Sequence, residues 1–167
     1  MDELILGETE HTLTETDVEQ IQQLTTTIVC QADRKIDILT RDFDPLTYDN
    51  DEMFEAFESF VLQNHRCHVR VILHDPQLAA SRGHCLIDLG KKLSSFFSFR
   101  CLPERFKSYA DTFLIADNIG VIHKPYPDSL KTNFHFSDAQ LAKSLGNTFT
   151  QMWEEAEPHP YLSSIMI

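Results

Sequence analysis

The chain has few basic residues, few glycines and prolines and no long apolar run, and each shortage excludes a class of protein. It carries 14 Lys and Arg against 26 Asp and Glu, a net charge of −12. Because DNA, RNA and anionic membranes attract Lys and Arg, we expect this chain to bind neither nucleic acid nor membrane. No stretch approaches the roughly 18 apolar residues of a membrane-spanning helix. Five glycines and seven prolines leave no flexible linker.

Signals for export, disulfides and metal binding are also missing. Residues 1–7 lack the positive charge and apolar stretch of a signal peptide, so a cytoplasmic protein is expected. None of the four cysteines has Cys-x-x-Cys spacing, and each falls in or beside an apolar run, which predicts buried, reduced thiols. Residues 65–68, His-Arg-Cys-His, have no second cluster to complete a zinc site. We therefore expect no metal and no cofactor.

Helical and strand periodicities alternate along the 167 residues, and 42% of the residues are hydrophobic. Such a chain is expected to form a single domain over residues 1–167. Helices are predicted at about 14–31, from 49 or 50, at 78–93 and from 137; strands at 36–40, 69–73 and 96–102; and a hairpin at 112–124. Residues 4–6 are a candidate extra strand, and residues 42–50 a loop. The order predicts an α/β fold with a mostly parallel sheet, a late antiparallel hairpin and helices on both faces.

The hairpin carries a resemblance to a known family. Residues 110–117 read Ala-Asp-Thr-Phe-Leu-Ile-Ala-Asp and lead into Asn-Ile-Gly-Val-Ile. This pattern of residues resembles the strand–turn–strand that bears the His-x-Lys-x-x-x-x-Asp motif. Residues 38–42, 69–76, 83–87 and 149–153 match as well. The chain resembles half of a phospholipase D-like domain, and more closely a bacterial group of degenerate domains often fused behind N-acetyltransferase domains. The resemblance implies a homodimer and an acetyltransferase-type partner enzyme.

The motif itself is degraded. Counting back from Asp117 puts Ala110 in the histidine slot and Thr112 in the lysine slot. In the catalytic family that histidine attacks phosphorus and the lysine holds the phosphate charge. Alanine has no nucleophilic atom and threonine has no positive charge, so we expect no phospholipase D-type catalysis and assign no catalytic residue.

Polar residues at the predicted strand ends are the candidate site instead. In open α/β sheets, ligands bind beyond the carboxyl ends of the strands. The candidate ligand-binding residues are Arg41, Asp42, Asp75, His84, Arg100 and Asp117. The sequence leaves three readings open: a site for a small anionic ligand bearing phosphate or carboxylate, a dimer contact, or an internal ion-pair network. The leading hypothesis is a non-catalytic binding or interaction module that regulates a partner enzyme; the alternative is an enzyme or sensor for an anionic ligand.

Overall fold

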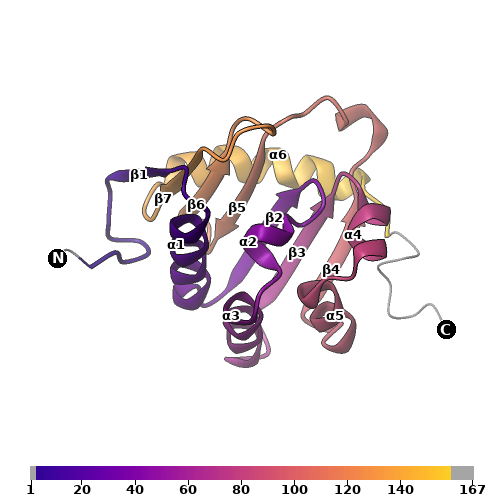
Figure 1. The fold of residues 1–167 in the computed structure, drawn as a ribbon, viewed down its shortest axis with the longest axis horizontal. Helices are drawn as coiled ribbons and strands as arrows, with labels where there is room; N and C mark the ends of the chain where they lie inside the picture. The colour runs from indigo at the N-terminus through magenta and orange to yellow at the C-terminus, as the bar shows by residue number, and fades with distance from the viewer. Residues whose placement is uncertain (1–2, 159–167) are drawn as a thin grey trace.

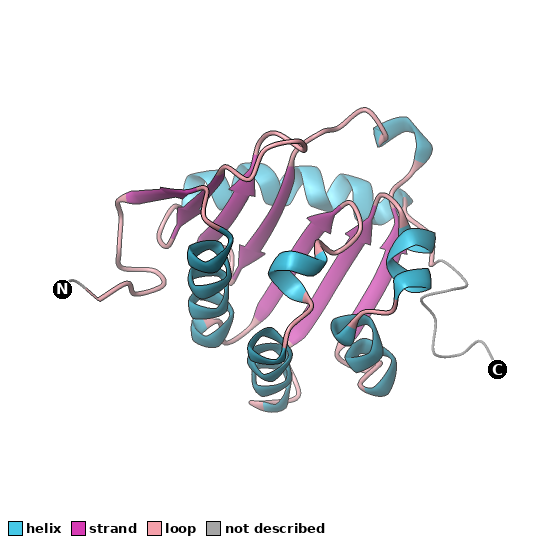
Figure 2. Ribbon diagram, viewed as in Figure 1, coloured by secondary structure: helices cyan, strands magenta, loops and turns pink. Residues whose placement is uncertain are grey.

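The computed structural model describes residues 3–158 and shows one seven-stranded sheet with helices on both faces (Figures 1 and 2). The strands are β1 (Thr12–Glu15), β2 (Lys35–Thr40), β3 (His68–Leu73), β4 (Phe97–Cys101), β5 (Thr112–Ala116), β6 (Gly120–Lys124) and β7 (Thr132–His135). The helices are α1 (Val18–Gln31), α2 (Pro45–Tyr48), α3 (Asp51–Leu62), α4 (Pro76–Arg82), α5 (Cys85–Lys92) and α6 (Ala139–Glu155), with a 3-10 turn η1 (Glu104–Phe106).

The strand order is β1-β7-β6-β5-β2-β3-β4, which confirms the α/β class but makes the sheet mixed rather than mostly parallel. Strands β2, β3 and β4 run parallel, whereas β5 pairs antiparallel with β2 at the centre of the sheet. The pairings β5–β6, β6–β7 and β1–β7 are also antiparallel. The predicted antiparallel hairpin is present as β5 and β6, and the antiparallel part of the sheet is larger than predicted because β1 and β7 were not foreseen.

The two faces of the sheet have separate apolar layers. Helices α1 to α5 cover one face and α6 crosses the other (Figure 1). Phe57 and Phe60 from α3 anchor the first layer, and Phe149 and Met152 from α6 anchor the second. Alternate residues of each strand face opposite layers, so the parallel strands are apolar on both sides along most of their length.

Several predicted elements need correction. The expected helix at 78–93 is two helices, α4 and α5, because Gly83 adopts φ +74 and His84 caps α5. Residues 4–6 form no strand, and the loop at 42–50 contains α2. Asn50, one of the two predicted capping residues, caps α3, whereas α6 is capped by Asp138, one residue after the predicted start at 137.

The cysteines are free thiols, but they are not all buried: Cys67 is buried, Cys85 and Cys101 are half-buried and Cys30 is exposed. Cys30 was expected inside because it borders an apolar run, and it instead occupies the solvent side of α1 near the end of that helix. Within the described residues no helix has the length and apolarity needed to cross a membrane.

Candidate functional site

A cavity of about 370 Å³ opens where β2 ends and β5 begins. Its polar lining is five threonines, one tyrosine, two cations and two acids: Thr25, Thr40, Thr47, Thr112, Thr132, Tyr48, Arg41, Lys124, Asp42 and Asp44. An apolar wall completes it, formed mainly by Ile21, Leu39, Leu78, Phe113, Leu114 and Ile122. A volume of this size and a mixed lining of this kind suit a small molecule with one charged group.

The acids of the cavity are already engaged. Asp42 forms an ion pair with Arg82 of α4, and Asp44 accepts a hydrogen bond from the Thr47 hydroxyl at 2.7 Å. Within residues 3–158, neither Arg41 nor Lys124 forms an ion pair. The cavity therefore presents two cations without an ion pair against one unpaired carboxylate, that of Asp44, and this excess of positive charge favours an anionic occupant.

The cavity adjoins the segment that resembles the His-x-Lys motif. Thr112, in the lysine slot, lines the cavity and lies opposite Lys124 in the β5–β6 register. Ala110, in the histidine slot, is exposed just before β5. Sequence reasoning missed Lys124 as a site residue; the signal was available, because the predicted hairpin ends at that position, directly across from Thr112.

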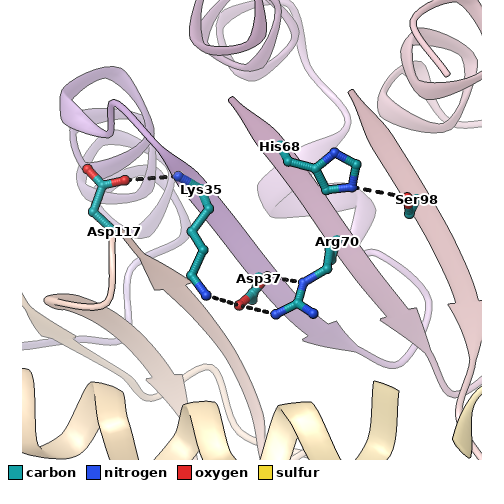
Figure 3. Close-up of polar contacts among 6 residues, drawn as sticks. All are labelled: Lys35, Asp37, His68, Arg70, Ser98 and Asp117. Atoms are coloured by element: carbon teal, nitrogen blue, oxygen red, sulfur yellow. Dashed lines mark hydrogen bonds and ion pairs between the residues drawn. The ribbon is translucent and has the colours of Figure 1, made fainter. Parts of the chain in front are cut away.

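Asp117 lies at the other end of β5, away from the cavity, in the turn to β6. Its carboxylate accepts backbone hydrogen bonds from Asp33, Arg34 and Lys35 at 2.9, 2.8 and 3.0 Å (the Lys35 contact is drawn in Figure 3). The direction of β5 explains the separation: β5 is antiparallel to β2, so its end meets the beginning of β2. Asp117 thus fixes the entry of the chain into β2.

Asp75 and His84 cap helices beside the cavity. Asp75 accepts from the Leu78 amide at 3.0 Å at the start of α4. His84 is 3% exposed; its Nδ1 accepts from the Leu86 amide at 3.1 Å and its Nε2 donates to the Phe43 carbonyl at 2.8 Å. Burial lowers the pKa of His84, consistent with a neutral ring whose two nitrogens are both used.

Arg100 is held on the α6 face of the sheet. Its Nη1 donates to the Trp153 carbonyl at 2.7 Å, and its guanidinium lies 4.1 Å from the centre of the indole ring.

Of the six predicted site residues, only Arg41 and Asp42 line the cavity. Asp75 is beside it, since the Asp75 amide donates to the Arg41 carbonyl at 2.7 Å.

A group of paired charged side chains, which was not predicted from the sequence, lies between the sheet and α6. Asp37, 3% exposed, accepts two hydrogen bonds from Arg70, at 2.8 and 2.9 Å, and Lys35 lies 3.5 Å from the same carboxylate (Figure 3). The Arg70 guanidinium also lies 5.0 Å from the centre of the Phe149 ring. The pairing follows from register, because Asp37 and Arg70 are cross-strand partners of β2 and β3. A carboxylate this well paired is a structural element of the α6 face.

One group of side chains has the composition of a metal site. Ligand atoms of Asp49, His84 and Cys85 lie within 4.8 Å of one another. However, both His84 nitrogens are engaged, and burial, with Asp49 adding to it, raises the pKa of the Cys85 thiol to about 12. A metal needs a thiolate and an imidazole lone pair, so this group does not suit one.

The fold is similar to that of solved phospholipase D family members. Nuc, a phospholipase D family member from Salmonella typhimurium, superposes with a TM-score of 0.60 at 10% identity, over 89% of this chain and 99% of Nuc. NucT from Helicobacter pylori gives 0.59 at 9% identity, over 89% and 100%. By sequence, residues 17–165 match the Domain of unknown function (DUF7931), and the chain belongs to that family. No curated protein matches the sequence.

A third likeness extends beyond enzymes. TrmBL2, an archaeal chromatin protein with a novel mode of DNA binding, superposes with a TM-score of 0.65 at 16% identity, over 91% of this chain. This chain spans 55% of the length of TrmBL2. At such identities these likenesses show the fold alone. The phospholipase D-like fold is confirmed; the association with acetyltransferases stays a prediction.

Proposed function

We propose that this chain is a non-catalytic binding module that holds a small anionic ligand in the cavity at the carboxyl end of β2. The observation that carries the proposal is the pair of cations, Arg41 and Lys124, which line the cavity without an ion-pair partner in residues 3–158. An anion between them would gain charge-assisted hydrogen bonds from both side chains.

The rest of the lining describes the ligand. Threonine hydroxyls can donate to or accept from the polar part of the ligand, and the wall of Leu39, Phe113 and Leu114 suits an apolar or aromatic part. The ligand class is therefore a small molecule with one phosphate or carboxylate on an apolar body.

The cavity lacks the groups for phosphoryl transfer. The histidine and lysine slots hold Ala110 and Thr112. The one acidic hydroxyl, that of Tyr48, has its pKa raised by burial and by Asp44, so the phenol stays protonated. Because the lining holds no histidine or cysteine and both of its carboxylates accept hydrogen bonds from neighbouring side chains, we expect binding without turnover.

The test uses phenyl phosphate, which carries a phosphate on an aromatic ring. We expect Arg41→Met and Lys124→Met each to weaken its binding about tenfold or more, since each removes a charged hydrogen-bond donor. Isothermal titration calorimetry measures this, with Lys91→Met on the exposed side of α5 as the matched control. We also expect no hydrolysis of bis(p-nitrophenyl) phosphate. Equal affinity in all three variants, or measurable turnover, would contradict the proposal.

The proposal also includes partners of this chain. A homodimer and an acetyltransferase-type partner rest on the family resemblance, and the regulation of such an enzyme would follow from ligand binding in the cavity. The expectation that the chain binds no nucleic acid rests on its net charge of −12. TrmBL2 binds DNA on a similar fold, so the fold itself does not decide this point.

A further inference from the structure

His74, the residue after β3, has a buried ring nitrogen without a partner. Its Nε2 makes no hydrogen bond among the described residues, although the atom is shielded from solvent. Buried polar side-chain atoms nearly always have a partner, because leaving one unpaired costs the desolvation of that group. An unpaired nitrogen at the carboxyl end of a strand thus marks a place where a ligand atom would be stabilised.

Two cations act on the same imidazole. Lys107, after η1, donates from Nζ to the His74 carbonyl at 2.8 Å. Arg41 follows the neighbouring strand β2, and the two strand ends are tied by the hydrogen bond from the His74 amide to the Thr40 carbonyl at 3.0 Å. Burial, then Lys107, then Arg41 lower the pKa of His74. Within residues 3–158, neither cation forms an ion pair.

The nearby acids are already engaged. Asp75, next to His74 in the chain, turns its carboxylate to the Leu78 amide at the start of α4. Asp42, next to Arg41, is paired with Arg82. Within the described residues neither acid forms an ion pair with Arg41 or Lys107, so an oxyanion would supply both a direct counter-charge and the missing acceptor.

We propose that Arg41, His74 and Lys107 form an oxyanion site at the carboxyl ends of β2 and β3, in which Nε2 of His74 donates a hydrogen bond to the bound anion. The inference rests on the proposed function, because Arg41 also lines the cavity. It deepens that function by placing the charged group of the ligand at the Arg41 end, with Lys124 as a more distant cation. The ligand class becomes a tetrahedral oxyanion, which can accept from three donors at once.

Binding at this site is coupled to a proton. Burial and two cations oppose a positive charge on His74, and a bound anion offsets the cations and accepts from Nε2. The imidazole takes up a proton as the anion binds, so affinity increases as the pH falls. One proton sets a ceiling of about tenfold in affinity per pH unit.

Sulfate is the probe for the test, because its charge does not change between pH 8 and pH 6. Binding is measured by calorimetry at constant ionic strength maintained with chloride, which keeps charge screening fixed. For the wild-type chain we expect sulfate affinity to rise several-fold from pH 8 to pH 6, within the one-proton ceiling. We expect Lys107→Met to weaken binding about tenfold at pH 6, and His74→Gln to abolish most of the pH dependence.

Lys91→Met is the control and should bind sulfate as the wild type does. Sulfate binding that is pH-independent, or that is unchanged in both His74→Gln and Lys107→Met, would overturn the oxyanion site. If phenyl phosphate still binds with the expected dependence on Arg41 and Lys124, the proposed function survives that result. If phenyl phosphate also fails to bind, the proposed function itself is wrong. Lys107 is exposed, so its variant tests the site even if His74→Gln folds poorly.

Discussion

Asp117 has a structural role at the entry to β2. The carboxylate receives three backbone amides from the segment that enters β2, and both Asp117 and Asn118 have positive φ, at 53° and 58°. Aspartate and asparagine tolerate this backbone conformation better than most residues. Asp117 is thus suited both to turning the chain and to receiving the amides.

We expect Asp117→Ala to lower the free energy of unfolding by about 1–3 kcal/mol, because three amides lose a charged acceptor and alanine fits the turn less well. Urea unfolding followed by circular dichroism measures the change. Asp128→Ala is the matched control: Asp128 is exposed in the β6–β7 loop and should change stability by less than about 0.5 kcal/mol. Equal losses in the two variants would show that Asp117 is a loop acid without a special role.

The sequence could identify Asp117 and could not reveal this role. The spacing of the motif picks out the aspartate, but its donors lie 82 to 84 residues earlier in the chain. Arg100 illustrates the same limit. Its place near the end of a strand was predicted, whereas the face it occupies depends on the register with β3 and on Trp153, 53 residues away.

At the scale of elements, the break between α4 and α5 positions the rim of the cavity. Gly83 ends α4 with φ +74 and ψ 138, and His84 turns inward to cap α5 and hold the Phe43 carbonyl. Phe43 stacks on the imidazole, with ring centres 4.8 Å apart, at the base of the loop that carries Asp42 and Asp44. The apolar periodicity runs through this break, so the sequence predicted one helix.

Two glycines, Gly83 at the break and Gly146 inside α6, offer a direct test of this break. A Cβ on Gly83 or on Gly146 of α6 would meet no atom within 4 Å, so neither substitution is limited by space. We expect Gly83→Ala to destabilise by about 1–3 kcal/mol, because an L-residue resists this backbone conformation. Gly146→Ala should stabilise by about 0.5–1 kcal/mol, since alanine favours the helix interior. Urea unfolding of both variants checks the signs; stabilisation by Gly83→Ala would mean that α4 and α5 join into one helix.

At the scale of the molecule, the class of fold could be predicted from the sequence, but the number of strands in the sheet and their pairing could not. Alternating periodicities require strands with helices packed against them, and they fix the α/β class. The edge strand β1 and its neighbour β7 each span four residues, too few for periodicity to distinguish them from loops. Pairing of β1 and β7 with each other and with β6 completes the antiparallel half.

Several histidines make the stability of the fold depend on pH. Burial is the first cause that lowers the pKa of four histidines, His68, His74, His84 and His135. They lie after or within strands of both halves of the sheet and at the start of α5. For His84 the reason is direct: a proton on Nδ1 would remove the acceptor of the Leu86 amide.

We expect the free energy of unfolding to decrease as the pH falls from 7.5 to 5.5. In the unfolded chain these histidines return to a pKa of about 6.5, whereas in the folded chain they titrate lower. Below about pH 6.5 the unfolded chain therefore binds more protons, and acidification favours unfolding by at most about 1.4 kcal/mol per pH unit for each histidine. Urea unfolding at fixed ionic strength gives this slope. His84→Gln should make the slope shallower, and His65→Gln, in the exposed turn before β3, should leave it unchanged. A slope that is flat or reversed in the wild-type chain would contradict the lowered pKa values, because the folded chain would then bind as many protons as the unfolded chain or more.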